Sequence, residues 1–346
     1  MEKFNPQSIG RYLESNIKGF KTLRTLEKFS GGQSNPTYLI TADSGNYVLR
    51  RQPMGEILKS AHAVDREFRV LSALQETGVP VPRVFHLCED LSVAGSLFYV
   101  MSFEQGRVFW DPAVPELAES DRVKIYDEMS RVLAALHSVN VQTVGLSDFG
   151  KPGDYFKRQI SRWTNQYRAS ETIAIDEMDQ LIDWLPENLP EDDGQVGLIH
   201  GDFRLDNLMF HPREPRVIAV LDWELSTLGH PFSDIAYQCM QLRMPHDAVI
   251  SGLGGIDRAA HRIPEEPAYI EQYCNQRGIA GIPNWNFYLA FSFFRFAAIL
   301  QGIMKRAIDG TASNENAVAY GELAPALARL GVELLSKDSA TTTIHS

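Results

Sequence analysis

Four polar residues in one stretch of the chain have the types and spacing that phosphoryl transfer needs. The stretch contains His200, Asp202, Asn207 five residues later, and Asp222 at the end of a second apolar run. In phosphoryl transfer one carboxylate orients the attacking hydroxyl, while an amide oxygen and a second carboxylate hold the magnesium ion that neutralises the phosphates. The pattern therefore predicts a catalytic role for Asp202 and metal-binding roles for Asn207 and Asp222.

The sequences around these residues predict the elements that must position them. Residues 198–199 and 217–221 are short apolar runs typical of buried strands, and each ends beside a polar residue that a rigid scaffold can fix. A lone Asp-x4-Asn pair in a loop is more often ordinary turn chemistry, because both side chains cap backbone groups. The addition of His200 and Asp222 favours a cation site, since closely spaced acidic and amide groups strain one another without a cation.

The wording HGDFRLDN followed by DWE resembles the aminoglycoside phosphotransferase-like branch of the protein-kinase-like superfamily. That branch carries a His-Gly-Asp-x4-Asn catalytic loop and a later metal-binding Asp. The resemblance implies an α+β, protein-kinase-like fold with two lobes. Its cofactors would be ATP and Mg²⁺, with GTP not excluded, and its partner a small-molecule hydroxyl acceptor. The expected parts are a nucleotide-binding lobe with an antiparallel sheet (1–104), an α-rich catalytic and acceptor lobe (105–335), and a disordered tail (336–346).

Two further residues are expected to support this loop without reacting. His200 is predicted to stabilise the loop by hydrogen bonding and not to act as a base. Asp234 opens an apolar helix, where it is a plausible N-cap. In the resembled family an Asp in this place braces the catalytic loop, so Asp234 is predicted to be structural.

A glycine-rich turn near the start of the chain is expected to contact the nucleotide phosphates. Two glycines and small polar residues let backbone N–H groups approach phosphate oxygens closely. A Gly-Gly pair alone would equally suit an ordinary hairpin, but the turn precedes the strand at 47–50, and in the resembled family this loop covers the triphosphate. The residues assigned to it are Ser30, Gly31, Gly32, Gln33 and Ser34.

The strand after this turn departs from the wider superfamily at the phosphate-binding cation. A Lys is expected there, yet the chain has Arg50 and Arg51. Alternation along a strand points the two to opposite sides, and the resemblance assigns Arg50 to the nucleotide, with Arg51 as the alternative. Glu67, on a helix predicted over 61–78, resembles the carboxylate that holds this cation; surface pairing along the helix is the other interpretation.

An apolar strand that runs into a polar linker is expected to end at the hinge. In the resembled fold, Met101 would line the adenine pocket, and the chain from Ser102 to Glu104 would supply backbone contacts to the base. A Met on a strand is also ordinary core filling. Helical periodicity dominates from residue 106, with helices expected over 120–139, 155–170 and 175–185.

Composition narrows the remaining choices. Hydrophobic residues make up 44% of 346 positions, enough for a large core in two lobes. The net charge of −11 argues against a nucleic-acid surface. Residues 285–304 are apolar over about the length of a membrane helix, but the central Arg295 favours a core helix with a buried ion pair. The three separated cysteines and the polar N-terminus lead us to expect buried thiols, a cytoplasmic location and no membrane partner.

The identity of the acceptor stays open at this point. The wording GGQSNPTY, HGDFRLDN and DWELSTLGHP is similar to that of the kinase-like domains associated with acyl-CoA dehydrogenases, which implies a hydroxyacyl-type acceptor. Aminoglycoside-, choline- and homoserine-type acceptors are alternatives. A rival of a different class is a catalytically weak or inactive nucleotide-binding module, which the missing Lys favours. The sequence does not predict an oligomeric state.

Overall fold

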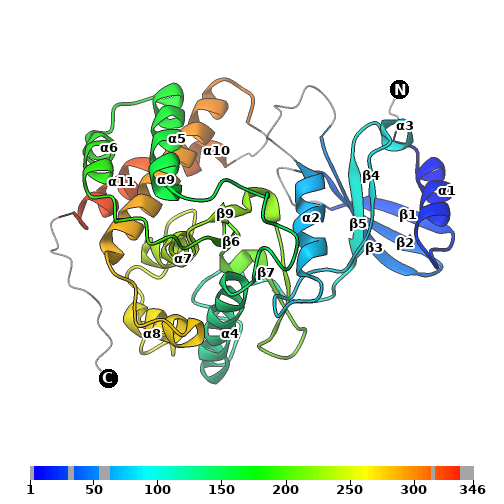
Figure 1. Ribbon diagram of the computed structural model, residues 1–346, viewed down its shortest axis with the longest axis horizontal. Coiled ribbons are helices and arrows are strands. Elements are labelled where there is room, and N and C mark those ends of the chain that lie inside the picture. The colour runs from blue at the N-terminus through cyan, green and yellow to red at the C-terminus, as the bar shows by residue number, and fades with distance from the viewer. Residues whose placement is uncertain (1–3, 30–34, 54–62, 313–315, 336–346) are drawn as a thin grey trace. The chain divides into compact units, whose positions relative to one another are not determined.

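The chain divides into two compact units that are each built from two segments. The computed structural model describes residues 4–29, 35–53, 63–312 and 316–335 (Figure 1). The first unit, here called the N-terminal unit, comprises Met1–Arg107 and Met209–Ser226. The second unit, here called the helical unit, comprises Val108–Leu208 and Thr227–Ser346. An antiparallel sheet in one unit and a helix-rich second unit confirm the expected α+β class. The predicted lobe boundary after residue 104 stays a prediction.

The N-terminal unit is organised around a five-stranded antiparallel sheet with the strand order β1-β2-β3-β5-β4. A tight turn joins β2 to β3, where Gly45 takes a φ of 126° opposite Ala42, a conformation that disfavours other residues. The register of β3 against β5 places Arg50 opposite Tyr99. The strands are β1 (Leu23–Lys28), β2 (Thr37–Ala42), β3 (Gly45–Arg51), β4 (Val84–Cys88) and β5 (Phe98–Ser102).

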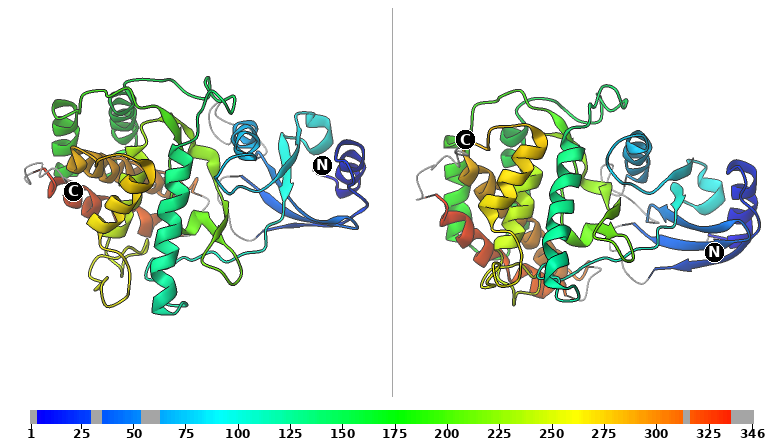
Figure 2. Two further views of the ribbon diagram at one scale, coloured as in Figure 1. Left: turned by 60° about the horizontal axis from the view of Figure 1, so that its bottom comes forward. Right: turned by 90° about the horizontal axis from the view of Figure 1, so that it is seen from below.

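Helices α1 and α2 cover opposite faces of this sheet (Figures 1 and 2). Helix α1 (Pro6–Asn16) begins with a proline, and the Asn5 side chain accepts a hydrogen bond from the Gln7 N–H, as an N-cap should. Together with α3 (Leu91–Ala94), it buries apolar side chains of the sheet. On the other face lies α2 (Val64–Leu74), shorter than the helix predicted over 61–78. Residues 30–34, the predicted phosphate turn, lie outside the described residues.

A hairpin from the middle of the chain completes the N-terminal unit. Strand β7 (Leu208–Phe210) pairs with β8 (Val217–Val220), and the short helix η2 (Trp223–Leu225) follows. Phe210 exchanges two backbone hydrogen bonds with Arg107, of 2.7 and 2.8 Å. A Cβ atom at Gly106 would lie 2.5 Å from the Phe210 carbonyl oxygen, so this close approach requires glycine. The hairpin thereby holds Asp222, which lies between β8 and η2.

The helical unit is built around α9 (Trp285–Ile308), which packs against α5, α6, α7, α10 and α11 (Figure 2). This helix is long and apolar enough to cross a membrane, but 78% of its most apolar window is buried inside the protein, as expected for a core helix. Helix α4 packs on α8, and β6 (Gly197–Ile199) pairs with β9 (Thr227–Gly229). The other helices are α4 (Glu119–His137), α5 (Tyr155–Ser170), α6 (Asp176–Glu187), η1 (Leu205–Asn207), α7 (Phe232–Arg243), α8 (Glu266–Arg277), α10 (Ala317–Gly321) and α11 (Ala324–Val332).

Candidate active site

The residues 200–207, here the Asp202 loop, connect β6 to the short helix η1 in the helical unit. Strand β6 is fully buried and hydrogen-bonded to β9, so it fixes the start of the loop. Gly201 then takes a φ of 85°, which turns the backbone sharply and favours glycine at this position. The loop ends in η1, whose single turn carries Asn207. A buried strand and a helical turn therefore position Asp202 and Asn207 from both ends.

The side chains of Asp202 and Asn207 are in direct contact. The Asn207 amide nitrogen donates to a carboxylate oxygen of Asp202 at 3.0 Å and to its backbone oxygen at 2.9 Å. Because the amide nitrogen is used in this way, the Asn207 side-chain oxygen is the atom left for another ligand. Amide and carboxylate oxygens are the ligand types that Mg²⁺ takes. The pair thus combines a positioned carboxylate with a candidate metal ligand.

Asp234 ties the Asp202 loop to α7. Its carboxylate accepts hydrogen bonds from the backbone N–H groups of His200 (2.6 Å) and Gly201 (2.9 Å), and it faces the His137 ring nitrogen at 3.3 Å. Burial opposes ionisation here, but the bonds from His137 and His200 outweigh it and lower the pKa of Asp234. The predicted N-cap is wrong: α7 starts at Phe232, and its cap makes no side-chain bond. The carboxylate accepts its hydrogen bonds from N–H groups of the loop and does not cap the N-terminus of the helix.

Arg295 supports the same loop from α9. Its guanidinium donates to the carbonyl oxygen of Gly201 at 2.7 Å and lies over the rings of Trp163 and Tyr237. Within the described part of the chain, this buried arginine therefore has a carbonyl and two aromatic faces as partners in place of the expected ion pair, and aromatic faces favour a cation. The His200 ring is fully buried and accepts a hydrogen bond from the Asp202 N–H at 3.2 Å. The loop is held by contacts from α7, α9 and its own backbone.

In the N-terminal unit, Arg50 bridges two carboxylates. Its Nε lies 2.8 Å from an oxygen of Glu67, and one of its terminal nitrogens donates to Asp222 at 2.9 Å. Glu67 is 1% exposed and also accepts hydrogen bonds from the Asn35 amide (2.7 Å) and the Tyr99 hydroxyl (3.1 Å). A guanidinium has donors in a fixed fork that can serve two acceptors at once. The arginine thus joins β3, α2 and the turn after β8.

Electrostatics and backbone conformation distinguish the two carboxylates of this cluster. Burial raises the pKa of Glu67 above its usual value, although the nearby Arg50 opposes the rise. Asp222 is different, because its side chain is 37% exposed and its backbone has a φ of 62°. A non-glycine residue in the left-handed region is a costly conformation that often marks a functional site. Asp222 is thus the accessible carboxylate, and Glu67 is the buried anchor.

Arg51 has a different environment from Arg50. It points to the face covered by α1, where its guanidinium lies 4.6 Å from the centre of the Phe4 ring and its Nε donates to the Ser96 hydroxyl at 3.1 Å. It is 3% exposed. The alternation expected for the two arginines is therefore present, and Arg50 lies on the face that carries the contacts to Glu67 and Asp222.

The predicted hinge residues lie at the end of β5. Met101 is half-buried and pairs with Val48 of β3. The Ser102 hydroxyl donates to the Glu104 carboxylate at 2.5 Å and accepts from the Arg83 N–H at 2.9 Å. These contacts order the strand end within the N-terminal unit, and the adenine-binding role of the segment stays a prediction.

The sequence reasoning missed several residues that support the site. Tyr99 and Asn35 hold Glu67, while His137 holds Asp234. The one available signal was the placement of polar groups among apolar residues, such as Tyr99 in β5 (Phe98–Ser102), because buried polar groups need partners. That signal does not name the partner, so these roles required the tertiary structure.

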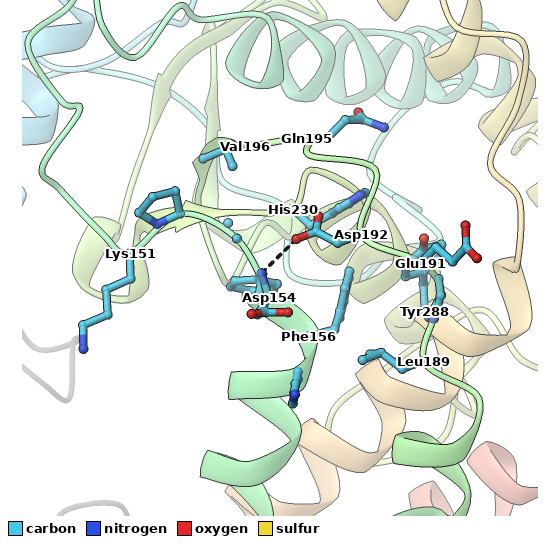
Figure 3. Close-up of a pocket in the computed structure, with 16 residues that line it drawn as sticks. Lys151, Asp154, Phe156, Leu189, Glu191, Asp192, Gln195, Val196, His230 and Tyr288 are labelled. Atoms are coloured by element: carbon cyan, nitrogen blue, oxygen red, sulfur yellow. Dashed lines mark hydrogen bonds between the residues drawn. The ribbon is translucent and has the colours of Figure 1, made fainter.

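Two pockets of the helical unit differ in their relation to the Asp202 loop. One, of about 240 Å³, is lined in part by Arg204, Leu205 and Asp206 of the loop. The other, of about 80 Å³, lies at the end of β9 between the start of α5 and residues 189–196 (Figure 3). There the Asp154 N–H donates to Asp192 at 3.1 Å. The first pocket thus adjoins the Asp202 loop, whereas the lining of the second includes no residue of that loop.

A model of the phosphotransferase enzyme family APH matches residues 25–286. The chain belongs to the APH phosphotransferase family. This APH-family chain is also 48% identical to a Ralstonia eutropha protein provisionally assigned as an aminoglycoside phosphotransferase, with a TM-score of 0.88 over 96% of this chain and 98% of that one. The ternary complex of aminoglycoside phosphotransferase APH(4)-Ia with ADP and hygromycin B is 14% identical, with a TM-score of 0.63 over 95% and 99% of the two chains, and shares the fold. The kinase-like fold predicted from the motifs is confirmed.

Relatives of this APH-family chain agree with the subgroup that the motif wording indicated. Mouse acyl-CoA dehydrogenase family member 10 is 49% identical over 94% of this chain, which spans 31% of that protein. Human acyl-CoA dehydrogenase family member 11 is 43% identical over 98% of this chain, which spans 44% of that protein. The chain thus spans less than half the length of these relatives.

Proposed function

We propose that the chain is an ATP-dependent phosphotransferase that moves the γ-phosphoryl group to a hydroxyl of a small molecule. The observation that carries this proposal is the Asp202 carboxylate, held at 3.0 Å by Asn207 on a loop that Asp234 and Arg295 brace. Asp202 orients the acceptor hydroxyl and takes its proton late in the transfer, because phosphoryl transfer depends mainly on positioning and charge stabilisation. Membership of a phosphotransferase family supports the reaction class.

The binding roles follow from the chemistry of the side chains. Arg50 binds phosphate oxygens of the nucleotide, and Glu67 holds Arg50 in place. Asn207 and Asp222 supply amide and carboxylate oxygens to Mg²⁺, which when bound neutralises phosphate charge. The likeness in fold to a phosphotransferase solved with ADP supports a nucleotide substrate.

The acceptor proposed here is hydroxyacyl-like, with aminoglycosides as the second class. Support for the first comes from relatives that are named as acyl-CoA dehydrogenase family members. The chain matches only part of those proteins, so no dehydrogenase activity is assigned to it. We further propose that the protein is cytoplasmic and has neither nucleic-acid nor membrane partners. The net charge of −11 supports the absence of a nucleic-acid partner.

The test is the Asp202→Ala variant, assayed for magnesium-dependent ATP turnover against a panel of hydroxylated acceptors and for nucleotide binding by calorimetry. Turnover should fall about a hundredfold or more, while nucleotide affinity stays near that of the wild type. Asp183→Ala, at an exposed position of α6, is the matched control and should retain full turnover. Turnover retained by Asp202→Ala would refute the assignment. A wild-type protein that binds ATP without transferring phosphate would support the inactive module instead.

A further inference from the structure

The cavity beside the Asp202 loop has three walls with different chemistry. The loop contributes Arg204, Leu205 and Asp206, and α7 contributes Gln238 and Gln241. The third wall is the loop at 249–251, in the segment that follows α7. With a volume of about 240 Å³ the cavity suits a compact group rather than a whole drug-sized molecule.

The charge of this cavity does not suit a polycationic ligand. Its charged lining residues are Arg204 and Asp206, and these two form an ion pair with each other. The remaining lining residues are apolar or uncharged. Several ammonium groups need unpaired carboxylates around them, and the lining supplies none. The apolar surface instead suits a hydrocarbon segment.

Two amide groups give the cavity its polar specificity. Gln238 is 1% exposed, and its side-chain oxygen accepts a hydrogen bond from the Tyr269 hydroxyl at 3.0 Å, which leaves its amide nitrogen as the free end. Gln241 lies three residues further along α7, on the same helix face. Both amide nitrogens are buried, and neither has a hydrogen-bond partner among the residues that the structure describes. A buried donor without a partner is costly and calls for an explanation.

We propose that this cavity binds an oxygen-bearing group of the acceptor, a carbonyl or a carboxylate attached to an apolar segment, and that Gln238 and Gln241 donate hydrogen bonds to that oxygen. The proposal rests on the proposed phosphotransferase function, because it places the recognition of the acceptor beside the Asp202 loop. Gln238 keeps the hydrogen bond from Tyr269 to its oxygen, so its amide nitrogen is the end left to donate. The amide of Gln241 can rotate about its last side-chain bond, a torsion with a broad preference in glutamine. Amide donors match an oxygen and do not match an ammonium group.

A glycine-rich segment holds the third wall in place. The Gly252 N–H donates to the Pro245 carbonyl at 3.1 Å, and the Gly254 N–H donates to the Met244 carbonyl at 2.8 Å. A Cβ atom at Gly252 would lie 2.1 Å from the Met244 oxygen, so the turn closes only with glycine. These glycines thus serve backbone packing next to the cavity.

The experiment compares two probes of equal chain length, 5-hydroxypentanoate and 5-aminopentan-1-ol, titrated into the full chain by calorimetry without nucleotide. The wild type should bind the hydroxycarboxylate more tightly than the amino alcohol. In Gln241→Glu the new carboxylate should weaken hydroxycarboxylate binding at least about tenfold and reverse the preference. Gln166→Glu, the same change at an exposed position of α5, should leave both affinities unchanged. Thermal unfolding verifies that each variant is folded.

The outcomes separate the inference from the proposed function. A wild-type preference for the amino alcohol, no binding of either probe, or equal effects of the Gln241→Glu and Gln166→Glu changes would each overturn the inference. If Gln241→Glu does not fold, Gln241→Met replaces it and should lose hydroxycarboxylate affinity without gaining amino alcohol affinity. Binding as expected without any phosphotransfer would leave the inference standing and refute the proposed function.

Discussion

Replacing Arg50 with alanine should destabilise the N-terminal unit through Glu67. The side chains of this pair are 14% and 2% exposed, and the variant leaves the glutamate without its cation. Removal of one partner from a buried ion pair costs about 3–5 kcal/mol. Glu67 keeps its hydrogen bonds from Tyr99 and Asn35, and a hydrogen bond to a charged group contributes about 1.5–3 kcal/mol. We therefore expect the free energy of unfolding to fall by about 3 kcal/mol at neutral pH, the lower end of that range.

The size of this loss should depend on pH in a defined direction. Burial raises the pKa of Glu67 in the folded protein, Arg50 opposes the rise, and the variant should therefore raise it further. A group with a raised folded pKa contributes its stability below the unfolded pKa and loses it as the pH rises through the folded pKa. At about pH 4 Glu67 is largely protonated with or without Arg50, so the two proteins should differ little. The difference should grow toward neutral pH.

The assay is the free energy of unfolding in urea for the wild type, Arg50→Ala, Glu67→Gln and the double variant, at about pH 4 and about pH 7.5. The double variant should be more stable than Arg50→Ala at the higher pH, because no charge stays buried. Arg24→Ala, which breaks an exposed pair, is the control and should leave the free energy of unfolding close to that of the wild type. A loss in Arg50→Ala that is equal at both pH values, or strictly additive single effects, would refute this account of the cluster.

Two further variants test the Asp202 loop. Asn207→Ala removes both the donor at 3.0 Å from the Asp202 carboxylate and the proposed amide ligand of magnesium. Turnover should therefore need a higher magnesium concentration, which a magnesium titration of the activity measures. An unchanged magnesium dependence would contradict the ligand role. Asp234→Asn replaces a buried carboxylate whose pKa is lowered in the folded protein, so its stabilisation is present above the unfolded pKa and lost as the pH falls. The variant should lose about 1–3 kcal/mol of unfolding free energy at neutral pH. Its unfolding free energy should also depend less on pH in the acid range, as acid titrations of unfolding would show. An unaltered acid transition would count against the bracing role.

Local patterns in the sequence predicted local elements well. The apolar runs at 198–199 and 217–221 coincide with β6 (Gly197–Ile199) and β8 (Val217–Val220), and the helix expected at 155–170 is α5 (Tyr155–Ser170). The contact between Asp202 and Asn207 lies within one loop, so spacing alone was informative. In these cases the residues that decide the structure are neighbours in the sequence.

Contacts between distant segments left no comparable signal. Arg50 and Asp222 are separated by 172 residues, and Arg295 and Gly201 by 94. The sequence placed a cation in α9 but could not reveal that its acceptor is a backbone carbonyl exposed by the turn at Gly201. The N-cap predicted for Asp234 failed for the same reason, because the N–H groups of His200 and Gly201 in the Asp202 loop donate to its carboxylate. Tertiary packing decides such competitions.

The same distant contacts bear on whether the missing lysine implies an inactive protein. That alternative rested on Arg50 standing where a lysine is expected. The contact expected of the lysine, an ion pair with the glutamate of α2, is nonetheless made by Arg50 to Glu67 at 2.8 Å, and the fork of the guanidinium reaches Asp222 as well. A lysine, with a single charged nitrogen, would have to divide its donors between the two carboxylates. The substitution thus fits a cluster with a second acceptor and no longer favours the loss of activity.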